Sequence, residues 1–173
     1  MQEWNSACET GKQKEQLTMD KEQLTMKDGF RGAKTLISKN EQDTQHIAAE
    51  FAATLRRGDV VALFGDLGAG KTAFTRGVAA AVGADSSKVS SPTFTLLNEY
   101  DSEIKIYHFD VYRLENVELA ELDWMDEYLF GDGVCLIEWA EYILPILPEN
   151  YIKVELERIS DDERKITITR MEK

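Results

Sequence analysis

Residues 60–72 read VVALFGDLGAGKT, and this stretch determines the architecture of the 173-residue chain. Val60 to Phe64 form an apolar run typical of a buried strand, and the residues from Gly65 to Thr72 match the pattern GxxxxGK followed by Ser or Thr. The stretch from Ala73 to Val82, which stops at a glycine, favours a helix. A strand, a glycine-rich loop and a helix in this order predict a phosphate-binding loop, or P-loop.

The predicted P-loop has a defined chemistry. Its glycines allow positive φ angles and let backbone N–H groups approach phosphate oxygens, and the N-terminus of the helix adds a partial positive charge. We expect Lys71 to neutralise the β- and γ-phosphate oxygens and Thr72 to offer its hydroxyl to Mg²⁺. The alternative is a simple turn, which the strand-to-helix context disfavours. The nucleotide-binding candidates in this segment are Gly65, Asp66, Leu67, Gly68, Ala69, Gly70, Lys71, Thr72 and Ala73.

Composition indicates one globular domain, with 43% hydrophobic and 9% aromatic residues. No apolar run approaches the roughly 18 residues of a membrane span, and the polar segment from Gln2 to Lys14 lacks the apolar core of a secretory signal. We therefore expect a cytoplasmic protein with no membrane attachment. Cys8 and Cys135 stand alone, so a structural disulfide or zinc site is not expected.

The charge is unevenly spread along the chain. The formal net charge is -12, but residues 1–40 carry seven basic and six acidic groups, which leaves 13 basic and 26 acidic groups in the rest. Such a surface repels nucleic acid, because phosphate binding needs clustered Lys and Arg. If the protein serves an RNA pathway, we expect it to act through protein partners. The alternative meaning of the acidity is that it keeps the protein dispersed in solution.

The first part of the chain differs from the rest. Residues 14–19, KEQLTM, recur one heptad later as residues 21–26, which is too short a repeat to predict a coiled coil. We interpret residues 1–35 as a flexible, dispensable extension, and residues 36–173 as the P-loop domain. Met19 and Met26 are alternative starts, so the repeat can also be upstream sequence.

The remaining pattern predicts an α/β fold. Helical spacing appears from Thr44 to Leu55 and, in a segment with six carboxylates and no basic residue, from Glu115 to Glu127. Residues 107–110 and the apolar run 134–137 predict buried strands, whereas residues 151–156 and 165–169 alternate and predict an antiparallel hairpin at a sheet edge. Together, these helices and strands predict a P-loop NTPase-like three-layer sandwich, with a mainly parallel central sheet and antiparallel edge strands.

Two acids follow predicted strands, where the metal of a P-loop site would lie. Glu138 comes after four apolar residues, which fits a strand whose acid reaches Mg²⁺ or orients the attacking water. Asp110 is the second candidate metal ligand. For each acid alone, the alternative is that it caps the following helix. The candidate catalytic residues are therefore Lys71, Glu138 and Asp110.

Several residues near these acids are weaker candidates. Thr93 and Thr95 lie in a Pro-bearing loop where switch-type NTPases sense the γ-phosphate, although ordinary loop hydrogen bonding explains them equally well. His108 shares a strand face with Asp110, so a site role is possible, but a lone strand histidine is more often a packed residue. Trp139 follows Glu138 and either lies at the mouth of the site or closes the core.

Four linked motifs resemble one family. They are GDLGAGKT at residues 65–72, SPTFTL at 91–96, YHFDVYRL at 107–114 and LIEW at 136–139, and together they are similar to the TsaE (YjeE) ATPases over roughly residues 36–173. The resemblance implies a small P-loop ATPase that binds ATP and ADP with Mg²⁺. It also implies assistance to the TsaD–TsaB complex, which places a threonylcarbamoyl group on an adenosine of tRNA.

The resemblance also implies roles for single residues. Those matching Thr72 and Glu138 serve the magnesium, and those matching Asp110 and Trp139 are functional. In that family, the segment before the first helix and the late strands also approach the nucleotide, so the resemblance implies further contacts from these parts of the chain. The residues suggested for these contacts are Glu41, Thr44 and Arg164. The extension with its repeat has no counterpart in the family pattern.

Two other functions remain open at this stage. A small-molecule P-loop kinase has a similar size but needs an acceptor pocket and usually a lid with several arginines. The other alternative is a nucleotide-binding module without turnover. The arginines that follow the P-loop are scattered along the chain at Arg76, Arg113, Arg158, Arg164 and Arg170.

Overall fold

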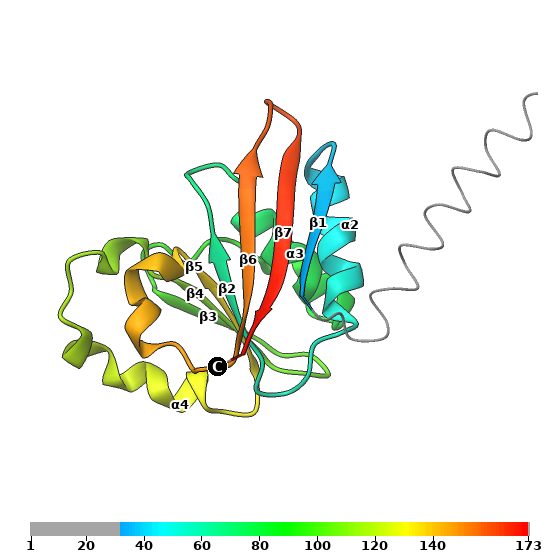
Figure 1. Cartoon of the computed structure of the whole chain (residues 1–173). Coiled ribbons are helices and arrows are strands. Elements are labelled where there is room, and N and C mark those ends of the chain that lie inside the picture. Colours follow the sequence, from blue (N-terminus) through cyan, green and yellow to red (C-terminus); the bar gives the residue numbers. More distant parts are fainter. Residues whose placement is uncertain (1–31, 173) are drawn as a thin grey trace, which may run out of the picture.

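The computed structural model describes residues 32–172, and the predicted extension of residues 1–35 lies almost wholly outside them. The domain is built around a seven-stranded sheet with the order β1-β7-β6-β2-β5-β4-β3 (Figure 1). The strands are β1 (Ala33–Ser38), β2 (Val60–Phe64), β3 (Leu97–Tyr100), β4 (Ile106–Asp110), β5 (Val134–Glu138), β6 (Tyr151–Arg158) and β7 (Arg164–Met171). β1 begins three residues before the domain start predicted at residue 36.

The centre of the sheet is parallel and its margins are antiparallel. β2 pairs in parallel with both β5 and β6, and β5 pairs in parallel with β4. The hairpin of β6 and β7, the pair of β7 and β1, and the pair of β3 and β4 are antiparallel. The parallel centre and the antiparallel margins confirm the predicted fold class. The carboxyl ends of β2, β4 and β5 meet at one edge of the sheet, where α/β proteins bind ligands.

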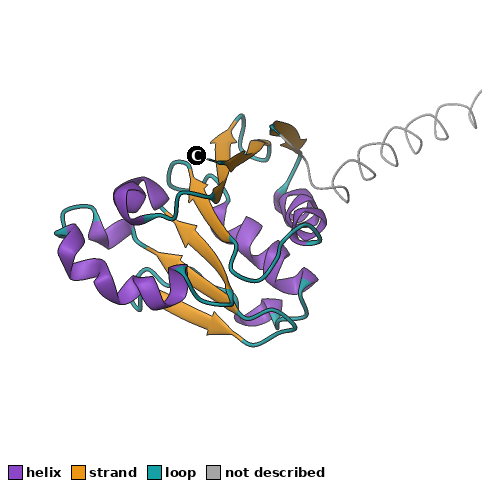
Figure 2. Cartoon of the chain, turned by 60° about the horizontal axis from the view of Figure 1, so that its bottom comes forward, coloured by secondary structure: helices purple, strands orange, loops and turns teal. Residues whose placement is uncertain are grey.

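Helices cover both faces of the sheet (Figure 2). One face packs against α2 (Glu41–Ala52) and α3 (Lys71–Ala81), in a core that includes Phe51 and Phe74. The other face packs against α4 (Asp126–Leu129) and the 3-10 helices other than Ser86–Lys88, which lies beside α3. The 3-10 helices span Ser86–Lys88, Tyr112–Leu114, Leu119–Met125 and Ala140–Ile146.

The apolar run of β2 follows from this arrangement. Val61 and Leu63 belong to the core beneath α2 and α3, whereas Val60 and Ala62 belong to the core on the opposite face. Successive side chains of a strand point to opposite faces, so a strand buried on both sides cannot alternate with polar residues. The structure therefore explains why the sequence that precedes the P-loop is continuously hydrophobic.

Two predictions of local structure were wrong. The hairpin was placed at the sheet edge, but β1, which was not predicted, pairs with the outer side of β7 and forms that edge. The segment from Glu115 to Glu127 is not one amphipathic helix; it contains the 3-10 helix Leu119–Met125, which leads directly into α4. A continuous α-helix would have stacked its unpaired carboxylates at helical spacing, where like charges repel.

Candidate nucleotide-binding site

The P-loop connects the end of β2 to the start of α3, and two glycines determine its path. Gly65 has φ 139°, and a Cβ atom there would lie 2.3 Å from the carbonyl oxygen of Leu156 on β6. Gly70 has φ 105° and is the N-cap residue of α3. The first bond of the helix runs from Phe74 N to Gly70 O at 2.9 Å, so the amides of Lys71, Thr72 and Ala73 have no partner within the helix and can face an anion.

Lys71 is buried inside this loop. Its ammonium donates to the carbonyl oxygens of Gly65 at 2.5 Å and of Asp66 at 3.0 Å, and lies 3.6 Å from the ring centroid of Trp139. Burial lowers the pKa of Lys71 below its usual value, and the negative charge of Glu138 and other nearby carboxylates opposes this effect. The lysine is therefore a desolvated ammonium whose hydrogen-bond partners are two backbone carbonyl oxygens of the loop.

Glu138 ends β5 directly beside the start of α3. The hydroxyl of Thr72 donates to its two carboxylate oxygens at 2.8 and 3.1 Å, and His108 Nε2 lies 2.9 Å from its Oε1. Glu138 is only 3% exposed. The sequence brings these groups together because β4 and β5 are parallel neighbours and because α3 begins beside their carboxyl ends.

Asp110 ends β4 and holds the loop that follows the 3-10 helix Ser86–Lys88. Its Oδ2 accepts bonds from the hydroxyls of Ser91 and Thr93, the latter at 2.7 Å. Its Oδ1 accepts from the backbone N–H of Tyr112 at 3.1 Å. The carboxylate thus fixes the Ser91–Thr93 segment against the site.

Trp139 adopts a left-handed conformation with φ 63°, which is uncommon for a residue other than glycine. The chain therefore turns sharply after Glu138, and the indole lies over Lys71. The ring also packs against Tyr112, with centroids 4.8 Å apart, and stacks with Tyr142 at an interplanar angle of 3°. Both predicted placements of Trp139 apply, since the ring borders the site and closes part of the core.

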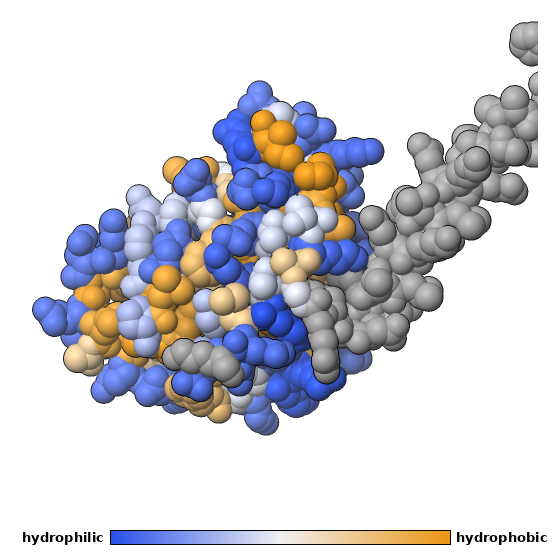
Figure 3. Space-filling model, viewed as in Figure 1, coloured by the Kyte–Doolittle hydropathy of each residue, from blue (hydrophilic) through white to orange (hydrophobic). Residues whose placement is uncertain are grey.

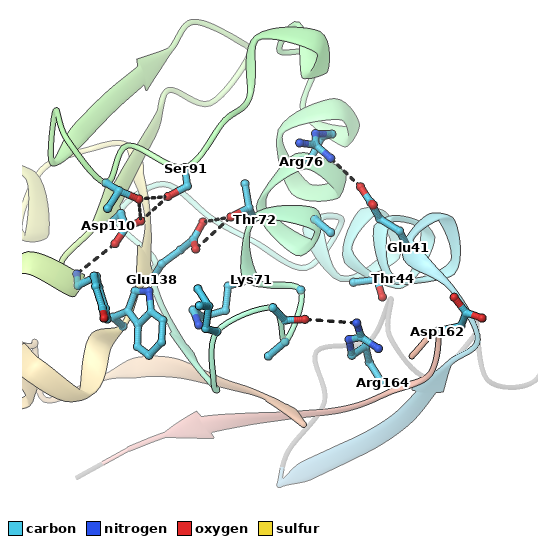
Figure 4. Close-up of a pocket in the computed structure, with 18 of the residues that line it drawn as sticks. Glu41, Thr44, Lys71, Thr72, Arg76, Ser91, Asp110, Glu138, Asp162 and Arg164 are labelled. Carbon is cyan, nitrogen blue, oxygen red and sulfur yellow. Dashed lines mark hydrogen bonds and ion pairs between the residues drawn. The ribbon is translucent and has the colours of Figure 1, made fainter. Parts of the chain in front are cut away.

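These groups surround one cavity of about 650 Å³ (Figure 4). Its far wall is made by α2 and by the hairpin of β6 and β7, where Glu41 pairs with Arg76 at 2.7 Å and Arg164 donates to Gly68 O at 3.3 Å. The predicted site residues that line the cavity are Glu41, Thr44, Leu67, Gly68, Ala69, Gly70, Lys71, Thr72, Ala73, Thr93, Asp110, Glu138, Trp139 and Arg164.

Three predicted residues do not line the cavity. Gly65 and Asp66 contribute instead through the carbonyl oxygens that hold Lys71. Thr95 bonds to Asn98 at 3.3 Å on the exposed side of its loop. Thr44 does line the cavity, but its hydroxyl is already hydrogen-bonded to the hydroxyl of Ser38 at 2.8 Å.

The structure adds cavity residues that sequence reasoning had not selected. They are Arg76, Ser91, Tyr112, Asp161 and Asp162. Ser91 belongs to the quoted SPTFTL motif, so the motif itself was the available signal. Arg76 had no such signal, because its place in the site depends on the packing of α2 against α3.

A Mg²⁺ ion is compatible with this donor set. No group of three or more His, Cys, Asp and Glu side chains that could hold a metal by themselves occurs in the part of the chain that the structure describes. Thr72 and Glu138 nevertheless place a hydroxyl and a carboxylate together at the mouth of the P-loop. Mg²⁺ in phosphate sites typically takes one or two such oxygens from the protein and the others from phosphates and water.

The chain is similar to known proteins in sequence and in structure. The family model described as "Threonylcarbamoyl adenosine biosynthesis protein TsaE" matches residues 38–166. The chain is 48% identical over 131 residues to the tRNA threonylcarbamoyladenosine biosynthesis protein TsaE of Bacillus subtilis, covering 75% of this chain and 81% of that protein. It is 40% identical over 136 residues to the protein of the same name from Treponema pallidum, covering 76% and 97%.

A solved structure is also similar. The crystal structure of YdiB from Bacillus subtilis superposes with a TM-score of 0.67 at 39% sequence identity, covering 82% of this chain and 88% of that one. The family match spans most of the chain and includes the P-loop, Asp110 and Glu138. The chain therefore belongs to the TsaE family.

Proposed function

We propose that the protein binds ATP and ADP with Mg²⁺ in the cavity beside the P-loop and hydrolyses ATP slowly. The observation that carries this proposal is the convergence of Lys71, Thr72 and Glu138 at the N-terminus of α3. The amides of the loop and the Lys71 ammonium would bind the phosphates. Mg²⁺, when bound there, would neutralise charge that develops on the phosphate oxygens.

Glu138 is the group best placed to assist hydrolysis. Its carboxylate is buried, bonded to Thr72 and directed to the start of α3. In the proposed reaction it orients the attacking water or the metal, while Trp139 and Tyr112 shield one side of the site from solvent. The kinase alternative gains no support from the described residues, because Arg76 is paired with Glu41 and Arg164 donates to loop carbonyls.

A substitution pair tests binding and hydrolysis separately. We expect Lys71→Ala to weaken nucleotide binding at least about tenfold, because it removes a charge-assisted contact to phosphate. We expect Glu138→Gln to keep nucleotide affinity and to lower the rate of phosphate release about 100-fold or more. Calorimetry with ATP and ADP, together with a single-turnover phosphate assay, measures both quantities.

Two exposed residues provide matched controls. Lys88→Ala and Glu157→Gln remove a lysine and a carboxylate whose partners, Asp85 and Lys165, lie outside the cavity. Both variants should behave as the unaltered protein. Equal turnover in Glu138→Gln and the unaltered protein would refute the role given to Glu138, and intact binding in Lys71→Ala would refute the site.

We further propose that this ATP cycle supports formation of N6-threonylcarbamoyladenosine in tRNA by a TsaD–TsaB complex. The names of the relatives and the acidic composition support this role, because a protein without clustered basic residues suits a regulator of other proteins better than a tRNA binder. A partner that prefers one nucleotide state must shift nucleotide affinity by the same factor. ATP and ADP affinities measured with and without TsaD and TsaB test this, and identical values would remove the proposal.

A further inference from the structure

A chain of polar groups that do not line the cavity leads through the sheet to Glu138. Asn98 Nδ2 lies 3.2 Å from the Tyr100 hydroxyl, and that hydroxyl lies 3.4 Å from His108 Nδ1. The other ring nitrogen, Nε2, lies 2.9 Å from Glu138 Oε1. These residues come from three neighbouring strands, β3, β4 and β5, so the sheet itself sets their spacing.

The bonds in this chain have one consistent direction. A carboxylate oxygen only accepts, so the bond to Glu138 places the hydrogen of the imidazole on Nε2. The unprotonated Nδ1 then accepts from the Tyr100 hydroxyl, whose oxygen in turn accepts from the Asn98 amide. Every donor in the chain therefore points toward Glu138, and this order selects one tautomer of His108.

Burial makes the loss of the contact between His108 and Glu138 unfavourable. The His108 side chain has no exposed surface and Tyr100 is 9% exposed, so neither finds water as an alternative partner. Glu138 is held by two side chains, Thr72, which lines the cavity, and His108, which does not. Rotation of the carboxylate about its Cγ–Cδ bond would break the contact to the imidazole and leave a buried nitrogen without a partner.

We propose that His108 is a positioning residue for Glu138, and that Tyr100 fixes the imidazole in the tautomer this requires. The inference rests on the proposed function, because positioning has a purpose only if Glu138 serves the nucleotide site. In metal sites, partners that orient a ligand in this way contribute about 10- to 100-fold to metal affinity or activity. His108 acts through Glu138 and does not touch the nucleotide.

The first test compares two substitutions in the full chain. His108→Leu removes the donor, whereas His108→Gln places an amide N–H where it can replace Nε2. We expect His108→Leu to bind ADP normally in EDTA but to lose about 10- to 100-fold in phosphate release and in the part of ADP affinity that depends on Mg²⁺. His108→Gln should recover most of both, and Tyr100→Phe should show a smaller loss.

A double-mutant cycle separates positioning from general destabilisation. If His108 acts through Glu138, then His108→Leu adds nothing to the loss of turnover already caused by Glu138→Gln. An additive loss in that background would overturn the proposal. So would an unchanged Mg²⁺-dependent affinity in both His108 variants.

A measurement without nucleotide keeps the inference distinct from the proposed function. Nitrogen-15 NMR of the unaltered protein should show the Nε2–H tautomer of His108, with a slowly exchanging proton whose resonance shifts in Glu138→Gln and Tyr100→Phe. The Nδ1–H tautomer, or a proton insensitive to both substitutions, would refute the positioning contact even if ATP binds. Absence of ATP binding in the unaltered protein would instead refute the proposed function.

Discussion

At the level of single residues, the partly buried carboxyl group of Glu141 lowers the stability of the fold, and no contact in the site requires it. Its Oε2 is buried and has no hydrogen-bond partner among the described residues. Burial raises the pKa of Glu141 above its usual value of 4.5, an effect that its own backbone N–H and the nearby Lys71 charge only partly offset. Because the folded state resists ionisation of this carboxyl group, the free energy of unfolding falls as the pH rises from the usual pKa towards the raised pKa.

We therefore expect Glu141→Gln to raise the melting temperature at pH 7. Glutamine resembles the protonated acid, so the gain should shrink as the pH falls through about 4.5, because the carboxyl group then becomes neutral in the unfolded state as well. Thermal unfolding of both proteins from pH 4 to pH 8 measures this. Glu121→Gln, on the exposed surface, is the control and should shift little. A gain that is constant with pH would contradict the explanation.

Sequence reasoning found the site residues that belong to contiguous motifs. Lys71 and Thr72 follow from the loop pattern, and Asp110 and Glu138 follow from acids that end predicted strands. It could not find Arg76, which enters the cavity through its pairing with Glu41, 35 residues away. It also left His108 undecided, because the contact to Glu138 depends on the pairing of β4 and β5.

At the level of elements, the crossing of α2 over α3 depends on a glycine. A Cβ atom at Gly77 would lie 2.3 Å from Gln45 O and 2.8 Å from Ala48 Cβ, both on α2. The close approach keeps α2, and with it Glu41 and Thr44, against the helix that begins at the P-loop.

We expect Gly77→Ala to destabilise the protein by about 1–2 kcal/mol. Alanine favours the helix by about 0.5–1 kcal/mol, but forcing the two helices apart costs about 1–3 kcal/mol, so the steric effect wins. Urea denaturation measures the difference. Ala80→Gly, at an exposed position of the same helix, isolates the propensity effect and should cost at most about 1 kcal/mol. An unchanged or more stable Gly77→Ala protein would contradict the steric argument.

The elements that sequence reasoning missed share a physical cause. β1 has alternating exposure and contains Lys34 and Thr35, so it lacks the apolar run that identified β2. Its strand conformation comes from pairing with β7, which is distant in sequence. The 3-10 helix Leu119–Met125 likewise depends on burying Leu122 and Met125 against the sheet, and periodicity alone cannot separate it from an α-helix.

At the level of the whole molecule, the surface is predominantly hydrophilic in the view of Figure 3, with apolar side chains gathered over the layer that contains α4. The exposed large hydrophobic residues of that layer are Tyr112, Leu119, Trp124, Phe130 and Leu144. No helix in residues 32–172 is long and apolar enough to cross a membrane.

The acidic charge leads to a prediction about tRNA. We expect no measurable binding of tRNA by the protein alone at about 0.15 M salt, because phosphate contacts need clustered cations and the released counterions that go with them. Fluorescence anisotropy with labelled tRNA, with and without MgATP, tests this. Tight binding that weakens steeply as salt is raised would reveal a basic surface and contradict the expectation.

The pairing of β1 with β7 joins segments about 130 residues apart, and the P-loop strand β2 lies between β5 and β6. A nascent polypeptide that has left the ribosome only as far as β5 lacks one neighbour of β2, including the Leu156 carbonyl against which Gly65 packs. Contacts between such distant segments carry a large loop-closure entropy, which slows folding. If nucleotide binds at the P-loop as proposed, it would stabilise only chains that already contain the hairpin of β6 and β7, because β6 is one of the two neighbours of β2.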